Sequence, residues 1–190
     1  MAMIVSQRIQ AVRILKFDAG HRVVKHESKC RNLHGHEYKV EVFCEAPELD
    51  SLGRIIDFSC IKEVFGKWID DHLDHGSILN PRDPLCDSIW RDATNKVWFM
   101  SLYGFKAFCN PTVENISKEI FLAMELLMQD EDSGLHIQKV KIFETPNCFT
   151  ECTNESISDE QRENFQLANK DEIERYGKSL GVVEYDSRKL

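Results

Sequence analysis

Apolar and polar residues alternate in two stretches near the start of the chain, which is typical of strands that bury one face. The first stretch spans residues 8–17 and leads to His21, and the second follows His34 and His36. The apolar side of the second stretch consists of Tyr38, Val40 and Val42. Side chains two residues apart leave a strand on the same face, so His34 and His36 open the second strand side by side.

Apolar residues at helical spacing predict three helices farther along the chain. The first spans residues 59–73, with Ser59 as its N-cap and Gly76 as the glycine that ends it. The second starts at residues 110–112, where Asn-Pro-Thr precedes a strongly apolar stripe. The third follows Ser158 in a capping-box sequence, and its high charge predicts a peripheral position.

Three other segments predict further strands. Residues 54–58 resume an extended apolar run after a turn by composition, so we expect a hairpin there. The aromatic-rich segment 81–110 is expected to hold a helix and then a short strand at about residues 104–109. Residues 136–144 alternate as a last long strand and end in Glu144.

Length and composition restrict the class of protein. The chain has 190 residues, enough for one domain with a hydrophobic core, alone or with an appendage. Its apolar runs are too short to cross a membrane and its N-terminus has no secretory pattern, so we expect a cytoplasmic protein. Seven cysteines without a small-scaffold framework favour reduced thiols. The net charge of −8 argues against a nucleic-acid partner.

One short segment is basic within this acidic chain. It lies between the first two predicted strands and contains Arg22, Lys25, His26, Lys29 and Arg31. Its residues favour two interpretations equally: a solvated loop, or a patch that faces a small phosphorylated ligand.

The histidines of the first two strands predict a metal site. His34 and His36 lie about 6.6 Å apart along one strand face, because each residue advances a strand by about 3.3 Å. An antiparallel neighbour would bring His21 opposite this pair as a third ligand. Three neutral imidazoles suit zinc and leave one position open for water or substrate. The alternative is three ordinary polar histidines at the ends of strands.

Two further groups are candidates for chemistry. Asp74 and His75 lie at the end of the first predicted helix, where His75 is either a general acid or base or an imidazole that interacts with the helix dipole. Glu144 continues the apolar face of the last predicted strand. A carboxylate there is costly unless it binds a polar group, so it either anchors a ligand or has reached solvent.

Six motifs occur in order between His21 and Thr145 and together resemble a known family. They are Phe-x-Ala-x-His, Cys-x3-His-Gly-His-x-Tyr-x-Val, Gly-x-Ile-x-Asp-Phe, Leu-Asp-His at residues 73–75, Asn-Pro-Thr-x-Glu-Asn and a strand that ends in Glu-Thr. The set resembles the 6-pyruvoyl-tetrahydropterin synthase family, and within it the bacterial 6-carboxy-5,6,7,8-tetrahydropterin synthases of queuosine-precursor synthesis.

The resemblance implies an α+β architecture called the tunnelling fold, or T-fold, in which two helices pack on one face of an antiparallel sheet. Subunits of this family associate into trimers and then into homohexamers, with active sites at subunit interfaces. We expect residues 1–152 to form the synthase-like domain and residues 153–190 to form a C-terminal helical extension, which is additional to the family pattern.

The family's functional residues carry over onto matching positions of this sequence. The resemblance implies one Zn²⁺ per subunit held by His21, His34 and His36. It also implies Cys30 as the catalytic base with Asp74 and His75 as its partners. Glu144 is expected to anchor the pterin ring, with Thr112 and Glu114 near the same end of the substrate.

The implied activity is that of a zinc-dependent carbon–carbon lyase. It would convert 7,8-dihydroneopterin triphosphate to 6-carboxytetrahydropterin, acetaldehyde and triphosphate. The short spacing from Cys30 to the histidine pair resembles that of the carboxy-forming enzymes, and no glutamate lies between Cys30 and His34. Two alternatives stay open: a 6-pyruvoyl-tetrahydropterin synthase, which eliminates triphosphate in the biopterin pathway, and a non-catalytic protein that binds pterin or zinc.

Overall fold

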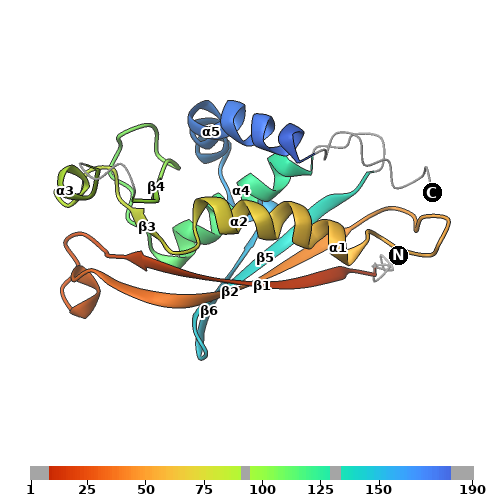
Figure 1. The fold of residues 1–190 in the computed structure, drawn as a ribbon, viewed down its shortest axis with the longest axis horizontal. Helices are drawn as coiled ribbons and strands as arrows, with labels where there is room; N and C mark the ends of the chain where they lie inside the picture. Colours follow the sequence, from red (N-terminus) through yellow and green to blue (C-terminus); the bar gives the residue numbers. More distant parts are fainter. Residues whose placement is uncertain (1–8, 91–94, 129–133, 181–190) are drawn as a thin grey trace, which may run out of the picture.

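A computed structural model describes residues 9–90, 95–128 and 134–180 of the chain (Figure 1). The strands are β1 (Ala11–His21), β2 (His34–Glu45), β3 (Gly76–Leu79), β4 (Val97–Phe99), β5 (His136–Thr145) and β6 (Cys148–Thr153). The helices are α1 (Phe58–Ile61), a π-helical turn (Lys62–Gly66), α2 (Lys67–His72), α3 (Cys86–Trp90), α4 (Val113–Leu127) and α5 (Asp159–Ser179).

The six strands form one sheet in the order β4-β3-β1-β2-β5-β6. Its central pairs, β1–β2, β2–β5 and β5–β6, are antiparallel as predicted. However, β3 is parallel to β1 and β4 is parallel to β3, so the prediction of a wholly antiparallel sheet was wrong. After β2, the helical segment 58–72 returns over the sheet in the direction opposite to β2 (Figure 1). The chain then continues into β3 in that same direction, which is the direction of β1.

Two helical layers lie on the same side of this sheet. The segment 58–72 and α4 cover the sheet directly, and α5 packs outside α4 (Figure 1). Alternate residues of β1, β2 and β5 meet the helices and are almost fully buried, which explains the period-two pattern of the sequence. The predicted α+β class, with two helices packed on one face of a sheet, is therefore confirmed.

The other face of the sheet carries alternating cations, carboxylates and aromatic rings. Lys39 Nζ lies 3.6 Å from the centroid of the Phe143 ring, and Lys141 Nζ lies 3.8 Å from that of Phe149. The Phe149 side chain is 52% exposed. Figure 1 shows the helices α1 to α5 on the opposite side, so none of them covers this face within the described chain.

The boundaries of the first helix differ from the prediction. Residues 54–57 form no strand, because Asp50 accepts hydrogen bonds from the backbone N–H groups of Leu52 and Arg54 and folds the segment into a turn. Asp57, rather than Ser59, caps α1 by accepting the backbone N–H of Ser59. Local side-chain hydrogen bonds therefore replace the hairpin that the apolar residues suggested.

The helix ends near Leu73 as predicted, but the role predicted for Gly76 as the glycine that ends it was wrong. His75 has the left-handed backbone conformation, with φ of 56°, that was expected of Gly76. Gly76 instead begins β3. A Cβ at Gly76 would lie 3.1 Å from the carbonyl oxygen of Leu73, so close packing rather than helix termination requires glycine there.

The segment 81–110 contains the expected helix, α3, but its strand is β4, earlier than predicted. Gly104 and Lys106 have φ values of 103° and 64°, which are incompatible with a strand at residues 104–109. The long strand β5 is confirmed, but it is not the last, because β6 follows after a tight turn.

The third predicted helix is confirmed as α5, with Ser158 as its N-cap in a capping box. Phe165 and Ile173 of α5 are fully buried in the common core, and the Tyr176 hydroxyl donates to Asp71. The division into residues 1–152 and 153–190 stays a prediction. No helix of the described ranges combines the length and apolar character needed to span a lipid bilayer.

One buried carboxylate joins α4 to the segment that follows β4. Glu119 is 2% exposed and accepts hydrogen bonds from Trp98 Nε1 and from the backbone N–H groups of Ser101 and Leu102. Burial raises the pKa of Glu119 to about 7, against these hydrogen bonds, which favour the ionised form. The side chain thus has a structural role in an otherwise apolar region.

We expect Glu119→Gln to lower the free energy of unfolding by about 1 to 3 kcal/mol, because the amide cannot accept all of these donors. The folded pKa of Glu119 lies above its ordinary value of 4.5, so its contribution is largest below that value and declines as the pH rises towards 7. The advantage of the parent over Glu119→Gln should therefore shrink between pH 5 and pH 8. Urea unfolding at pH 5 and at pH 8 measures the difference in free energy of unfolding, with Glu163→Gln, at an exposed position, as control. A difference that grows with pH would contradict the raised pKa of Glu119.

Candidate active site

The pairing of β1 with β2 brings three histidines together at one end of the sheet. In the antiparallel register His21 lies opposite His34, and Ala19 lies opposite His36. The ring centroids of the three imidazoles are 4.5 to 5.2 Å apart. A Cβ at Gly35 would lie 3.1 Å from the carbonyl oxygen of Ala19, so glycine between the two ligands permits this close pairing. The predicted convergence of His21 on the His34–His36 pair is confirmed.

The three histidine rings lie close enough together to hold one metal ion. One ligand atom from each ring lies within 4.8 Å of the others. Nδ1 of His21 is 2.8 Å from the carbonyl oxygen of Pro111, and Nδ1 of His34 is 2.8 Å from that of Asn32. If Nδ1 donates in each pair, Nε2 is left with a free lone pair, as in metal-binding histidines.

Two of these ring nitrogens, Nε2 of His21 and Nε2 of His36, are buried and have no hydrogen-bond partner among the described residues. Buried polar atoms normally have partners, so the orphaned pair fits a site that a metal ion completes. Burial lowers the pKa of His21 to about 4, with the neighbouring imidazoles adding to the effect. Burial also lowers the pKa of His36. Both rings are therefore neutral at pH 7, the form that binds metal.

Glu144 lies beside this group, as the alternation along β5 suggested. It follows the fully buried Val140 and Ile142, and its Oε1 is 3.6 Å from Nε2 of His21. That separation is longer than a hydrogen bond. The Glu144 side chain is 24% exposed, so it is partly accessible to solvent and keeps capacity to accept hydrogen bonds from a ligand.

Tyr38 is a site residue that sequence reasoning assigned only to the buried strand face. Its ring centroid lies 5.7 Å from that of His36, and its buried hydroxyl has no hydrogen-bond partner within the described ranges. Burial and the charge of Glu144 raise the pKa of Tyr38 well above its ordinary range. The available signal was its place two residues after His36, which puts both side chains on one face.

The start of α4 closes one side of the site. Pro111 contacts His21 through its carbonyl oxygen, and Thr112 caps the helix by accepting the backbone N–H of Asn115. Glu114 is in the first turn and is exposed. Thr112 and Glu114 are thus near the histidines along the chain, but among the described residues neither makes a hydrogen bond or ion pair with Glu144.

Cys30 lies in the loop that joins the two histidine-bearing strands. It occupies a single 3-10 turn, Lys29–Arg31, and is half-buried. Its carbonyl oxygen accepts the backbone N–H of Val23 at 2.8 Å, which links the two halves of the loop. The loop begins after His21 and ends before His34, so Cys30 is on the connection between two proposed ligands.

Asp74 and His75 form a hydrogen-bonded pair attached to β1. Asp74 Oδ2 is 2.5 Å from His75 Nδ1, and Asp74 Oδ1 accepts the backbone N–H of Asp18. Although burial opposes it, these hydrogen bonds hold the pKa of Asp74 below its usual value. The His75 side chain is 79% exposed. Among the described residues, no hydrogen bond or ion pair joins this pair to Cys30.

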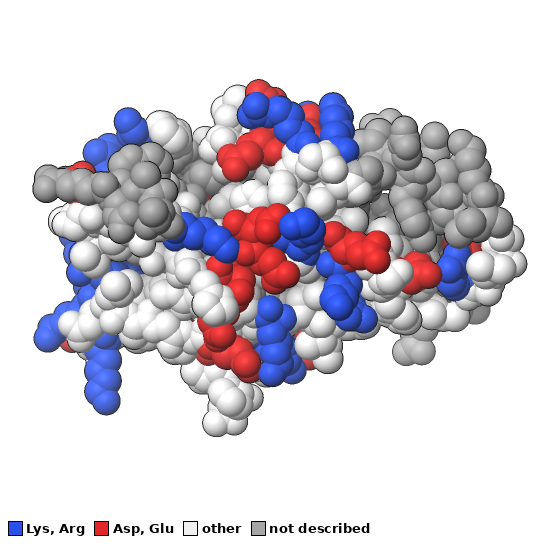
Figure 2. All heavy atoms as spheres, viewed as in Figure 1, with Lys and Arg blue, Asp and Glu red and all other residues white. Residues whose placement is uncertain are grey.

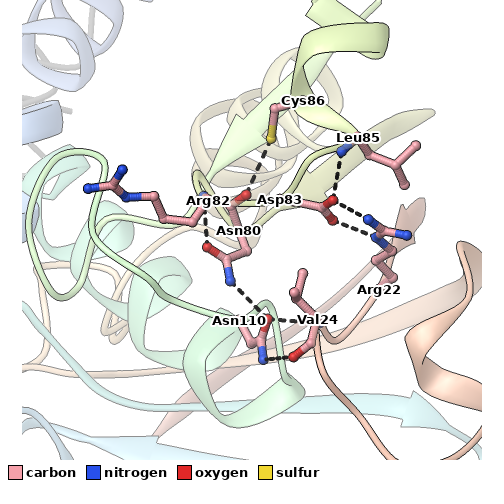
Figure 3. Close-up of polar contacts among 8 residues, drawn as sticks. All are labelled: Arg22, Val24, Asn80, Arg82, Asp83, Leu85, Cys86 and Asn110. Atoms are coloured by element: carbon pink, nitrogen blue, oxygen red, sulfur yellow. Dashed lines mark hydrogen bonds and ion pairs between the residues drawn. The ribbon is translucent and has the colours of Figure 1, made fainter.

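The basic segment divides into paired and unpaired cations. Arg22 makes a bidentate ion pair with Asp83 (Figure 3), and Lys25 Nζ lies 5.4 Å from the centroid of the Phe108 ring. Within the described ranges, Lys29 and Arg31 make no ion pair. Figure 2 shows blue side chains at the end of the molecule where Figure 1 places this loop, so a positive patch borders the site.

Comparisons with known proteins agree with this geometry. The sequence profile of the family described as 6-pyruvoyl tetrahydropterin synthase matches residues 11–155. A protein of Rickettsia felis named 6-carboxy-5,6,7,8-tetrahydropterin synthase is 38% identical over 148 residues, which cover 75% of this chain and 99% of that protein. The protein of the same name from Haemophilus influenzae is 30% identical over 141 residues, which cover 71% and 92%.

Solved structures share the fold. An uncharacterised protein from Wolinella succinogenes superposes with a TM-score of 0.63 at 23% identity, covering 78% of this chain and 99% of that one. The 6-pyruvoyl tetrahydropterin synthase of Caenorhabditis elegans gives a TM-score of 0.53 at 22% identity, covering 77% and 95%. The predicted T-fold is therefore confirmed.

We expect zinc to stabilise the protein through the three histidines. A ligand at 100 times its dissociation constant adds about 2.7 kcal/mol to the free energy of unfolding, so zinc should raise the Tm of metal-free protein by several degrees. His36→Ala should remove most of this shift in Tm. His136→Ala should keep it, because His136 begins β5 while Glu144, beside the three histidines, lies near the end of that strand. Thermal unfolding with and without zinc measures the effect; an equal shift in His36→Ala would contradict the site.

Proposed function

Because the chain belongs to the 6-pyruvoyl tetrahydropterin synthase family, we propose that it is a 6-carboxy-5,6,7,8-tetrahydropterin synthase. The reaction converts 7,8-dihydroneopterin triphosphate to 6-carboxytetrahydropterin, acetaldehyde and triphosphate, in the formation of a queuosine precursor. The observation that carries the proposal is the convergence of three imidazoles beside Glu144, in a chain whose relatives of that name match over nearly their whole length.

We propose that His21, His34 and His36 hold one Zn²⁺. The orphaned, buried Nε2 atoms of His21 and His36 and the neutral state of both rings support this assignment. When bound, zinc supplies Lewis acidity towards the hydroxyl groups of the substrate side chain. The carbonyl oxygens of Pro111 and Asn32 lie within hydrogen-bond distance of Nδ1 of His21 and His34, which supports ligation of the metal through Nε2.

Glu144 orients the substrate in this proposal. Its ionised carboxylate can accept two hydrogen bonds from the amino and ring N–H groups of a pterin, which fixes the register of the ring. Its partial exposure beside the histidines supports this role. Thr112 and Glu114, at the start of α4, are proposed to lie near the same end of the pterin.

Cys30 serves as the base that takes a proton from the substrate side chain. A thiolate is the reactive form, and a nearby cation or imidazole favours it. Asp74 and His75 are proposed as its partners. The His75 side chain is exposed, and among the described residues no hydrogen bond or ion pair joins it to Cys30, which is compatible with a site that a neighbouring subunit completes.

We further propose that subunits assemble into a homohexamer of two trimers in the cytoplasm. Two features of the fold favour assembly through the sheet. Its edge strand β6 presents backbone groups that can pair with another copy, and none of the helices α1 to α5 of the described ranges covers its second face. The exposed Phe149 lies on β6 and on that face.

Two other functions use the same scaffold. Elimination of triphosphate to give 6-pyruvoyl-tetrahydropterin needs the same metal site and base, and the family profile bears that name. A non-catalytic protein that binds pterin or zinc would need the histidines and Glu144 but no base. The presence of Cys30, Asp74 and His75 together disfavours the binding protein.

We expect zinc-loaded protein to convert 7,8-dihydroneopterin triphosphate to 6-carboxytetrahydropterin with release of acetaldehyde, as identified by mass spectrometry. Cys30→Ala should keep zinc and pterin binding but lose about 10²- to 10⁴-fold in kcat, the usual contribution of a general base. Cys148→Ala, which changes an exposed thiol on β6, is the matched control. Formation of 6-pyruvoyl-tetrahydropterin would assign the biopterin reaction, and parental turnover by Cys30→Ala would exclude Cys30 as the base.

Glu144→Gln should raise KM more than it lowers kcat. Loss of a charged acceptor from a ligand hydrogen bond costs about 1.5 to 3 kcal/mol, or roughly 10- to 100-fold in kcat/KM. Glu151→Gln removes a carboxylate that pairs with Lys139 and Lys141 instead, so it should leave both constants near the parental values. Steady-state kinetics of both variants measure kcat and KM. Equal effects of the two substitutions would refute the anchoring role of Glu144.

A further inference from the structure

The loop between β1 and β2, residues 22–33, is held by side chains rather than by strand pairing. It joins His21 to His34 and contains Cys30, so its conformation sets the position of Cys30 relative to the histidines. The second half of the loop, residues 26–33, makes hydrogen bonds within the loop and with His34. Among the described residues, it makes none to any other part of the chain. Attachment is concentrated at Arg22 and Val24 (Figure 3).

Asn110 makes the attachment at Val24. Its Oδ1 accepts the backbone N–H of Val24 at 2.9 Å, and its Nδ2 donates to the backbone carbonyl of Val24 at 3.0 Å. The side-chain amide thus pairs with both polar groups of one residue, as a neighbouring strand would do. Figure 3 shows the amide of Asn110 facing Val24 from the segment that precedes α4.

Two further asparagines fix the orientation of Asn110. Asn80, which is fully buried after β3, donates through Nδ2 to Asn110 Oδ1 at 3.0 Å. Asn115 of α4 donates through Nδ2 to the carbonyl oxygen of Asn110 at 2.9 Å. If the side-chain amide of Asn110 exchanged its oxygen and nitrogen positions, it would lose the hydrogen bonds to Asn80 and to Val24. Asn110 therefore presents a fixed donor and acceptor to the loop.

The second attachment is the ion pair of Arg22 with Asp83. The Asp83 side chain has no exposed surface, and its Oδ1 also accepts the backbone N–H of Leu85. Although burial opposes it, the hydrogen bonds from Arg22 and Leu85 keep the pKa of Asp83 below its ordinary value. The pair is ionised at pH 7 and holds the residue next to the proposed ligand His21.

These attachments reach Cys30 through one backbone hydrogen bond. Val23 lies between the two anchored residues, and its N–H donates to the carbonyl oxygen of Cys30 at 2.8 Å. The residue after Asn110 also contributes, because the carbonyl oxygen of Pro111 contacts Nδ1 of His21. The same short segment therefore holds a proposed metal ligand and, through Val23 and Val24, the proposed base.

We propose that Asn110 is a positioning residue that sets Cys30 against the metal site. This inference rests on the proposed function for the role of Cys30, but the ordering of the loop by Asn110 does not. If Asn110 only supported folding, its loss would affect the whole molecule evenly. As a positioning residue, it should affect the loop and the catalytic step while the histidines and the core stay intact.

The experiment compares Asn110→Ala and Asn110→Asp with the parent and with a control, Asn154→Ala. The side chain of Asn154 accepts a hydrogen bond from Arg162 and, within the described ranges, makes none to the loop. Asn110→Asp keeps the shape and the acceptor but replaces the donor to Val24 with a second acceptor. We expect both Asn110 variants to lose roughly 100-fold in kcat with KM changed less than about threefold, because a displaced catalytic group slows the chemical step. Zinc content should equal that of the parent.

A second readout needs no turnover. Iodoacetamide labelling, resolved by peptide mass spectrometry, should be at least about threefold faster at Cys30 in both Asn110 variants, because the released loop exposes the thiol. The exposed Cys148 is an internal reference and should keep its rate. An unchanged or slower rate at Cys30, or faster labelling of buried cysteines as well, would overturn the proposal. Absence of turnover in the parent would instead refute the proposed function.

If the Asn110 variants do not fold, hydrogen exchange of the zinc-loaded parent still tests the ordering. The amides of Val23 and Val24 donate to Cys30 and Asn110, so they should exchange at least about 100-fold more slowly than the exposed amides of Glu27 and Lys29. Equal exchange across the loop would contradict the attachment.

Discussion

The register between β1 and β2 is the constraint on which the rest of the site depends. It places His21 opposite His34 and next to His36 on the face that the helices cover. A shift of one residue would turn the histidines of one strand to the uncovered face and dissolve the group. Apolar side chains along both strands hold the register, since the same shift would expose Phe17, Val40 and their neighbours. The hydrophobic core and the metal site are therefore specified together.

Burial then determines the chemistry of the group. The site lies where the helix-covered core ends, so His21 is almost fully buried while Glu144 keeps partial access to solvent. Desolvation lowers the pKa of His21 and of His36, which keeps these two imidazoles neutral and ready to bind a cation. Their Nε2 atoms have no hydrogen-bond partner in the part of the chain that the structure describes. A carboxylate at the border can meet both the interior and an incoming ligand.

Much of this arrangement could be predicted from period-two alternation, which identified the His34–His36 pair, the place of His21 and the inward position of Glu144. Short elements gave no such signal: β3 and β4 have four and three residues, too few to show a period. Hydrogen bonds and ion pairs that side chains make between distant segments could not be predicted from the sequence either. Nothing in the sequence pairs Arg22 with Asp83 or aims Asn110 at Val24, because those contacts exist only once the sheet has formed.

The most direct test of this account is the zinc K-edge X-ray absorption spectrum of the zinc-loaded protein. The account predicts three imidazole nitrogens and one further light atom at about 2.0 to 2.1 Å, with no sulfur in the coordination shell. That result would leave the Cys30 thiol free to act as a base. A scatterer at about 2.3 Å, the usual zinc–sulfur distance, that disappears in Cys30→Ala would show that Cys30 is a ligand and would contradict the three-histidine site.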